Sequence, residues 1–172
     1  MSVYADRFEV MEVSGRGASG VVHRAWDRQL ARQVALKFAI DGVVGGPTNL
    51  RREYRLREQV LHPGLVSMLE LVERDGQMGL VMDWVEGPTL SAAMVAAPPD
   101  ARWPALTRLL RQAADALLAL HDAGLAHGDL KPEHLICTAP DTVVLIDFDV
   151  SGRFRSMGSR SEDLEGGSGT QG

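Results

Sequence analysis

Short apolar segments separated by turn residues make up most of the first half of the chain. Alternating or continuous apolar positions predict strands at residues 8–13, 21–26, 33–40, 66–72 and 78–82. The last two flank Asp75-Gly76, and an Asp-Gly pair between apolar runs is a strong signal for a tight hairpin. A charged segment with helical character, residues 50–61, interrupts this succession. The pattern therefore predicts a five-stranded antiparallel sheet accompanied by one helix.

The second half of the chain has helical spacing instead. Residues 103–123 form the longest predicted helix, with apolar residues recurring on one face and Gly124 at its end. Thr89 is a typical N-cap for a shorter helix over residues 90–95, which Pro98 and Pro99 end. Two more strands are expected at residues 135–137 and 143–146. Residues 151–172 are rich in glycine, serine and charge without apolar periodicity, which predicts a flexible segment.

Composition places this chain among globular proteins. Of its 172 residues, 45% are hydrophobic and 24% are charged, which is ordinary for a folded domain. The net charge of -5 argues against non-specific binding to nucleic acid. The single cysteine, Cys137, cannot form an internal disulfide, so a reducing, cytoplasmic setting fits best. The N-terminus lacks the plan of a signal peptide, and no apolar run is long enough to span a bilayer.

Gly15, Gly17 and Gly20 stand between two predicted strands. Glycine lets a hairpin fold closely over phosphate groups and leaves backbone N–H donors accessible to them. The same spacing occurs in dinucleotide-binding proteins, but there it leads into a helix, whereas residues 21–24 have strand character. A plain glycine-rich turn is the alternative interpretation of this motif.

Lys37 is the single charged residue in the apolar strand predicted at residues 33–40. One interpretation is an edge-strand lysine whose ammonium group reaches water. The other is a lysine that binds nucleotide phosphates, and its position after the glycine hairpin favours this second interpretation.

Two aspartates, Asp129 and Asp147, are separated by the short predicted strand–turn–strand of residues 135–146. A hairpin of that length brings both to the same edge. One carboxylate can then orient or deprotonate a hydroxyl group while the other holds a divalent cation on a triphosphate.

Taken together, these motifs resemble the protein kinase superfamily. HGDLKPEH at residues 127–134 is similar to the family's catalytic loop, and DFD at residues 147–149 is similar to its metal-binding motif. VALK at residues 34–37 and GTQG at residues 169–172 also resemble kinase motifs and occur in the family's order. HPGLV at residues 62–66 and EGPTL at residues 86–90 look most like bacterial serine/threonine kinases.

The resemblance implies an α+β, protein kinase-like fold with two lobes. Residues 8–82 would form the N-lobe, residues 83–88 the hinge, and residues 89–150 the first part of a mainly helical C-lobe with the catalytic loop. Residues 151–172 would be the remnant of a flexible activation segment. Nothing in the sequence corresponds to the later helices of a kinase C-lobe, so we expect a domain truncated within the activation segment.

The resemblance also implies that the chain binds ATP with Mg²⁺ or Mn²⁺ and acts on a protein substrate. The residues expected around the adenine and in the hinge are Val22, Ala35, Met82, Asp83, Val85 and Ile136. The glycines at positions 15, 17 and 20 would cover the phosphates, and Lys37 would bind them while paired with Glu53. Asp129 would orient the substrate hydroxyl, Lys131 would steady the transferring phosphoryl group, and Asp147 would hold the metal.

Four positions depart from the kinase pattern. Gly128 replaces an arginine that pairs with a phosphorylated activation loop in many kinases, and Arg57 occupies a usually apolar position on a helix whose charges are ordinarily solvated. His134 stands where the family has a metal-binding asparagine, although imidazole is a poor ligand for magnesium. Asp149 replaces a glycine and adds a carboxylate that could bind metal. For His134, a metal ligand and a buried, hydrogen-bonded core histidine are both open.

Three functions are compatible with these features. The first is an ATP-dependent serine/threonine protein kinase, which explains most residues. The second is a pseudokinase that binds nucleotide or a protein partner without transferring phosphate. The third is a small-molecule kinase of the aminoglycoside or sugar type, because HGD at residues 127–129 and ID at residues 146–147 are close to that branch.

Overall fold

The computed structural model describes residues 2–17, 20–39 and 46–147. Its strands are β1 (Ser2–Tyr4), β2 (Phe8–Gly17), β3 (Gly20–Asp27), β4 (Arg32–Phe38), β5 (Met68–Arg74), β6 (Gln77–Asp83), β7 (Leu135–Ala139) and β8 (Thr142–Leu145). The helices are α1 (Gly46–Arg57), α2 (Leu90–Ala96) and α3 (Pro99–Asp122), with a short 3-10 helix at Pro132–His134. None of these helices is long and apolar enough to cross a membrane.

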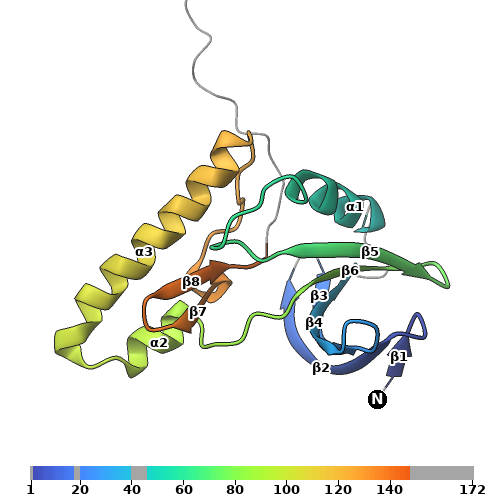
Figure 1. Cartoon of the computed structure of the whole chain (residues 1–172), viewed down its shortest axis with the longest axis horizontal. Coiled ribbons are helices and arrows are strands. Elements are labelled where there is room, and N and C mark those ends of the chain that lie inside the picture. The colour runs from blue at the N-terminus through green and yellow to red at the C-terminus, as the bar shows by residue number, and fades with distance from the viewer. Residues whose placement is uncertain (1, 18–19, 40–45, 148–172) are drawn as a thin grey trace, which may run out of the picture.

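The first six strands form one antiparallel sheet in the order β1-β2-β3-β4-β6-β5. Helix α1 lies along this sheet beside β5 and β6 (Figure 1). The predicted fold class is confirmed, but the count of five strands is wrong because β1 adds a sixth. Tyr4 anchors this strand: its hydroxyl donates to the Val72 and Gln77 carbonyls at 2.8 Å, and its ring meets Phe38 at 4.8 Å. A three-residue strand held by such distant contacts leaves no periodic signal in the sequence.

Two predicted helices begin about one turn later than they do in the structure. Helix α1 begins at Gly46 rather than residue 50, with Pro47 in its first turn, and ends at Arg57. Helix α3 begins at Pro99 rather than residue 103. Proline is favoured in the first turn of a helix because its missing N–H has no partner to lose there. Pro98 and Pro99, which follow the end of α2, therefore also mark the start of α3.

The apolar core runs through both halves of the molecule. One cluster on the sheet continues through Leu65 and Val66 to Leu120 of α3 and Leu145 of β8, all buried. Backbone hydrogen bonds join the same regions, since Val66 N–H donates to the Leu145 carbonyl at 2.9 Å. A second cluster, including Phe8, fills the opposite face of the sheet. The β7–β8 hairpin is thus fixed between α3 and the segment that follows α1.

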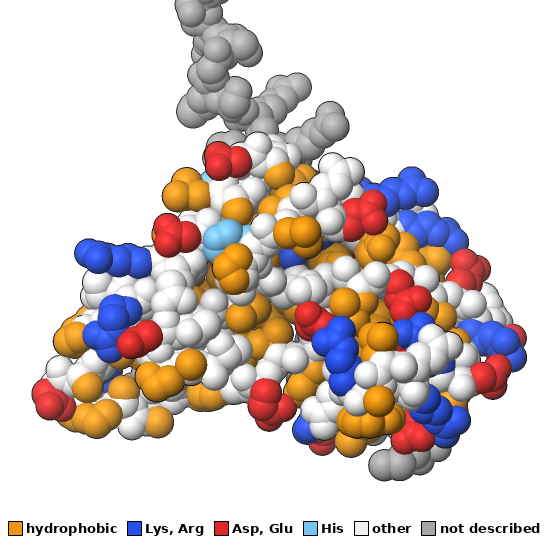
Figure 2. Space-filling model, viewed as in Figure 1, with side chains coloured by type: hydrophobic (Ala, Val, Ile, Leu, Met, Phe, Trp, Pro, Cys, Tyr) orange, Lys and Arg blue, Asp and Glu red, His pale blue; other side chains and the backbone are white. Residues whose placement is uncertain are grey.

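The two halves remain distinct in shape. In Figure 1 the six-stranded sheet with α1 occupies one side, and α2, α3 and the β7–β8 hairpin occupy the other. On the face in Figure 2, blue and red side chains are interspersed, and orange apolar side chains gather in the hollow between the halves. The chain passes from β6 to α2 through the extended segment of residues 84–89. The hollow beside this segment holds the candidate site.

Candidate active site

Lys37 lies at the centre of a buried charge cluster. Its Nζ is 3.0 Å from both carboxylate oxygens of Glu53 on α1 and 3.0 Å from Oδ1 of Asp147, which follows β8. The lysine side chain is 1% exposed, so the edge-strand interpretation with an ammonium group in water is wrong. Burial alone lowers the pKa of Lys37, but the attraction of Glu53 and Asp147 outweighs burial and raises the pKa above its ordinary value. Lys37 is therefore a permanent cation between two carboxylates.

Asp129 and Lys131 form a second, exposed pair in the loop before the 3-10 helix. Lys131 Nζ is 2.8 Å from Asp129 Oδ2, and about half of each side chain is exposed. The hydrogen bond from Lys131 lowers the pKa of Asp129, which stays ionised, and raises the pKa of Lys131. The loop turns at Gly128, whose φ of 83° is readily adopted only by glycine. The pair faces the cleft rather than the core.

His134 connects these two groups. Its Nδ1 lies 2.8 Å from the backbone oxygen of Asp129, and its Nε2 lies 3.3 Å from Oδ2 of Asp147. The residue is 7% exposed. Both interpretations of His134 thus have a structural basis, because one ring nitrogen is hydrogen-bonded to backbone and the other faces the carboxylate expected to bind metal.

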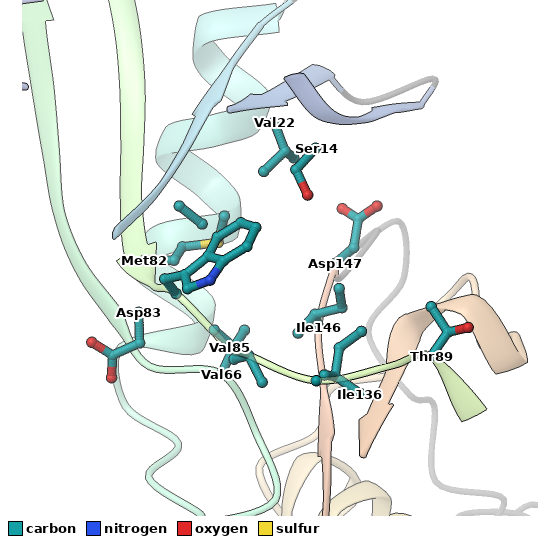
Figure 3. Close-up of a pocket in the computed structure, with 13 residues that line it drawn as sticks. Ser14, Val22, Val66, Met82, Asp83, Val85, Thr89, Ile136, Ile146 and Asp147 are labelled. Atoms are coloured by element: carbon teal, nitrogen blue, oxygen red, sulfur yellow. The ribbon is translucent and has the colours of Figure 1, made fainter. Parts of the chain in front are cut away.

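An apolar cavity of about 280 Å³ opens beside the link between the two halves. Figure 3 shows Val22 above it, Ile136 and Ile146 below, and Asp147 at one side. Its lining includes all the residues predicted around the adenine and in the hinge: Val22, Ala35, Met82, Asp83, Val85 and Ile136. A flat, largely apolar ring would be held here between the sheet and β7.

A polar cavity of about 490 Å³ continues from the apolar one. The two share lining residues, among them Val22, Ile146 and Asp147. The polar part contains most of the remaining predicted site residues: Gly15, Gly17, Gly20, Lys37, Asp129, Lys131, His134 and Asp147. Among the predicted residues that the structure describes, only Glu53 lines neither cavity, and it is paired with Lys37. Asp149 and the segment predicted to be flexible lie outside the described residues.

The three glycines of the hairpin differ in what surrounds them. A Cβ added at Gly15 or Gly17 would meet nothing within 4 Å, so packing does not demand glycine at either position. A Cβ at Gly20 would collide with the Phe38 carbonyl oxygen of the adjacent strand. Gly20 is therefore required by strand packing. The first two glycines instead keep the wall of the polar cavity free of side chains.

Arg57 is not on a solvated helix face. It is 3% exposed, and its guanidinium donates to the backbone oxygens of Val60 at 2.6 Å and Val66 at 2.5 Å. Burial lowers its pKa to about 10, with Glu53 acting in the opposite direction. Arg57 thereby ties the end of α1 to the segment that pairs with β8.

Sequence reasoning missed several lining residues, including Ser14, Trp84, Thr89, Glu133 and Ile146. Ser14, Trp84, Glu133 and Ile146 could have been found, because each adjoins a predicted site residue. Gly87 was also missed: a Cβ there would collide with the Cys137 carbonyl oxygen, so glycine lets the link approach β7. That requirement comes from a contact across 50 residues and has no local signal.

The cleft thus combines an apolar slot, a glycine-lined wall, a buried lysine and two carboxylates. A family model described as the protein kinase domain matches residues 8–170. The chain belongs to the protein kinase family. The resemblance predicted from its motifs is confirmed.

Curated relatives support the same assignment. The serine/threonine-protein kinase PknE of Mycobacterium tuberculosis is 33% identical over 84% of this chain and 26% of its own length. The serine/threonine-protein kinase pkn2 of Myxococcus xanthus is 34% identical over 84% of this chain and 18% of its own. The cell division control protein 2 homolog 3 of Trypanosoma brucei brucei is 30% identical over 87% and 49%, respectively. The chain spans about half or less of the length of these relatives.

Proposed function

We propose that this chain carries the nucleotide-binding and catalytic-loop portion of an ATP-dependent serine/threonine protein kinase, which transfers the γ-phosphoryl group to a protein hydroxyl. The observation that carries the proposal is the buried Lys37, which lines the polar cavity and is held by Glu53 and by Asp147, a residue that lines both cavities. A ring-sized apolar slot that continues into a glycine-lined cavity with a buried lysine suits an adenine nucleotide, with its base in the slot and its phosphates beside the lysine.

Each polar residue then has a role in this proposal. Lys37 binds the α- and β-phosphates, and Glu53 keeps its ammonium group oriented. Asp129, ionised and exposed in the cleft, accepts or orients the proton of the substrate hydroxyl. Lys131, 2.8 Å from Asp129, neutralises charge on the transferring phosphoryl group. Catalysis in this scheme comes from positioning and charge complementarity rather than from a covalent intermediate.

A divalent cation fits the donors at the end of the polar cavity. Asp147 offers carboxylate oxygens and His134 offers Nε2, 3.3 Å from Oδ2 of Asp147. Within the described ranges no group of three such side chains could hold a metal alone. Kinase-type cations are bound by one or two protein groups together with phosphate oxygens and water, so a two-residue site is sufficient. The ion would neutralise charge on the triphosphate.

A pseudokinase is the second candidate, and His134 in the position of the family's asparagine favours it. In that case the cleft binds nucleotide or a protein partner without turnover. The small-molecule kinase hypothesis is less favoured, because the family model describes a protein kinase domain and the two bacterial relatives named above are serine/threonine-protein kinases. A reducing, cytoplasmic location remains part of the proposal, resting on the free, buried Cys137.

Ligand-induced thermal stabilisation tests the proposed nucleotide site. ATP with Mg²⁺ or Mn²⁺ at a hundredfold excess over Kd stabilises the folded chain by about 2.7 kcal/mol. Lys37→Ala is expected to lose this gain, and the exposed Arg28→Ala, whose partner is Glu9, is expected to keep it. Isothermal titration with a non-hydrolysable ATP analogue covers the case in which Lys37→Ala is too unstable to melt cooperatively. A folded wild-type chain that gains nothing from ATP contradicts nucleotide binding and leaves the partner-binding pseudokinase.

A further inference from the structure

The ring nitrogens of His134 have different partners, and this fixes which one carries the proton. The backbone oxygen of Asp129, 2.8 Å from Nδ1, can only accept a hydrogen bond. Nδ1 must therefore be the donor and carry hydrogen. In the neutral ring, Nε2 is then left with a lone pair.

That lone pair faces another electron-rich atom. Oδ2 of Asp147 lies 3.3 Å from Nε2, while Oδ1 of the same carboxylate takes the ammonium group of Lys37 at 3.0 Å. Two lone pairs held this close repel each other unless a positive charge lies between them, either a metal ion or a second ring proton that pairs Nε2 with Asp147. The histidine is 7% exposed and its ring is held by backbone, so it cannot simply turn away.

This arrangement matches the usual support of a metal-binding histidine. Such a histidine generally donates its other ring N–H to a backbone carbonyl or carboxylate, which fixes the tautomer and the ring orientation. His134 has this support from Asp129 and an acidic neighbour in Asp147. The side chains of His134 and Asp147 also line the polar cavity, where a cation bound to a nucleotide can reach them.

We propose that His134 Nε2 and Asp147 Oδ2 together bind the nucleotide-associated cation and make this site prefer a first-row transition-metal ion to Mg²⁺. The inference rests on the proposed function, because nucleotide phosphates and water complete the coordination shell. Imidazole nitrogen is a better ligand for such ions than for Mg²⁺, which favours oxygen and ideal octahedral geometry. The affinity of nitrogen sites rises from Mn²⁺ to Co²⁺, so the preference over Mg²⁺ follows the same order.

The first experiment measures the affinity of a non-hydrolysable ATP analogue in the presence of Mg²⁺, Mn²⁺ or Co²⁺. The variant is His134→Asn, which replaces the nitrogen ligand by an amide oxygen able to bind Mg²⁺. His62→Asn is the matched control, since His62 lines neither cavity and its Nδ1 accepts from Gly64 N–H, as an asparagine oxygen can. The ratio of Co²⁺-supported to Mg²⁺-supported affinity is expected to fall at least about tenfold in His134→Asn, by analogy with the loss when a metal ligand's support is disturbed. In His62→Asn it is expected to stay unchanged.

A spectroscopic measurement on the wild-type chain needs no substitution. With Mn²⁺ and the analogue bound, pulsed electron paramagnetic resonance is expected to detect a nitrogen bound directly to the metal. Incorporating ¹⁵N-histidine into the chain must change that coupling, which distinguishes it from nitrogen of the nucleotide.

The outcomes separate the inference from the function on which it rests. The metal preference is overturned if the ratio of Co²⁺-supported to Mg²⁺-supported affinity is unchanged in folded His134→Asn. It is also overturned if no coupling between Mn²⁺ and a histidine nitrogen is detected while the analogue is bound. Either result leaves the nucleotide site intact. Failure of the analogue to bind with any cation overturns the proposed function and the metal preference with it.

Discussion

Two buried charge clusters on the same sheet serve as a comparison. Asp27 ends β3 and is fully buried, and Lys37, near the far end of β4, is 1% exposed. The register places Asp27 opposite Arg32 and Lys37 opposite Val22, so the clusters lie at opposite ends of the β3–β4 pair. Both require an ion to be taken out of water, which is costly unless it is compensated. They differ in how complete that compensation is.

The Asp27 cluster is complete within the fold. The carboxylate accepts hydrogen bonds from Nε and Nη2 of Arg7 at 2.8 and 2.6 Å, and from the backbone N–H groups of Gln29 and Leu30. Although burial raises the pKa of Asp27, these hydrogen bonds outweigh it, and the pKa is lowered. The described residues around Asp27 thus satisfy its carboxylate without a ligand.

The Lys37 cluster is incomplete. One ammonium group faces two carboxylates, and Oδ2 of Asp147 has a histidine nitrogen 3.3 Å away. Asp147 borders the polar cavity, where a divalent cation could bind its carboxylate. The comparison teaches that burial of an ion pair alone does not mark a functional site. A functional site is marked instead by a hydrogen-bond donor or acceptor that borders a cavity and can still bind a ligand.

Asp27→Asn is expected to have the largest effect on folding. An amide cannot accept every hydrogen bond offered to the carboxylate, and breaking a buried pair costs about 3 kcal/mol of unfolding free energy. Urea denaturation measures this loss. Asp6→Asn is the matched control, because Asp6 is 84% exposed and its φ of 55° is also tolerated by asparagine. Equal stability of the two variants would contradict a structural role for the Asp27 cluster.

Asp147→Asn is expected to change the stability of the fold little but to abolish the metal-dependent stabilisation by ATP. Asp147 is 28% exposed, Lys37 keeps Glu53, and asparagine tolerates the φ of 55°, so unfolding free energy should change by less than about 1 kcal/mol. The metal-dependent part of the stabilisation by ATP, up to about 2.7 kcal/mol at a hundredfold excess over Kd, should disappear. Thermal melts with and without metal and nucleotide measure both quantities. Retention of the full metal-dependent gain would exclude Asp147 as a ligand.

We expect acid to reduce the contribution of the Asp27 cluster to the free energy of unfolding. The pKa of Asp27 in the folded chain lies below its ordinary value of 3.8, so the unfolded chain takes up that proton first. Its contribution is fully present above the unfolded pKa and is lost as pH falls through the folded pKa. The difference in unfolding free energy between wild type and Asp27→Asn should therefore be constant near neutrality and shrink below about pH 4. A difference that grows in acid would contradict the assigned direction of the shift.

Lys131→Ala is expected to have the smallest effect on folding. Its pair with Asp129 is exposed, and exposed pairs contribute little to stability, so the unfolding midpoint should not move measurably. In the proposed function its role is at the transferring phosphate. The variant should bind the ATP analogue more weakly, by a few-fold, in calorimetric titration. A large drop in the unfolding midpoint would instead show that Lys131 has a structural role.

Much of the fold could be predicted because local patterns agree with the final structure. The five predicted strands of the sheet and the β7–β8 hairpin correspond to observed strands, and the Asp75-Gly76 turn lies where the motif predicts it. Strand β1 could not be predicted, since three residues carry no period and Tyr4 finds its partners about 70 positions away. The buried state of Arg57 was likewise hidden, because its acceptors are backbone oxygens beyond the end of its helix.

The sequence by itself determined which residue types are available at the candidate site and their order along the chain. Motif order was enough to name Lys37, Glu53, Asp129 and Asp147 as site residues. Only the tertiary structure decided how these groups share charge, since Lys37 and Asp147 are 110 positions apart and meet only after the two halves pack together. The same is true of His134. Its place in the motif is local, but the direction of Nε2 depends on a carbonyl on one side and a carboxylate on the other, which only the folded chain brings within reach.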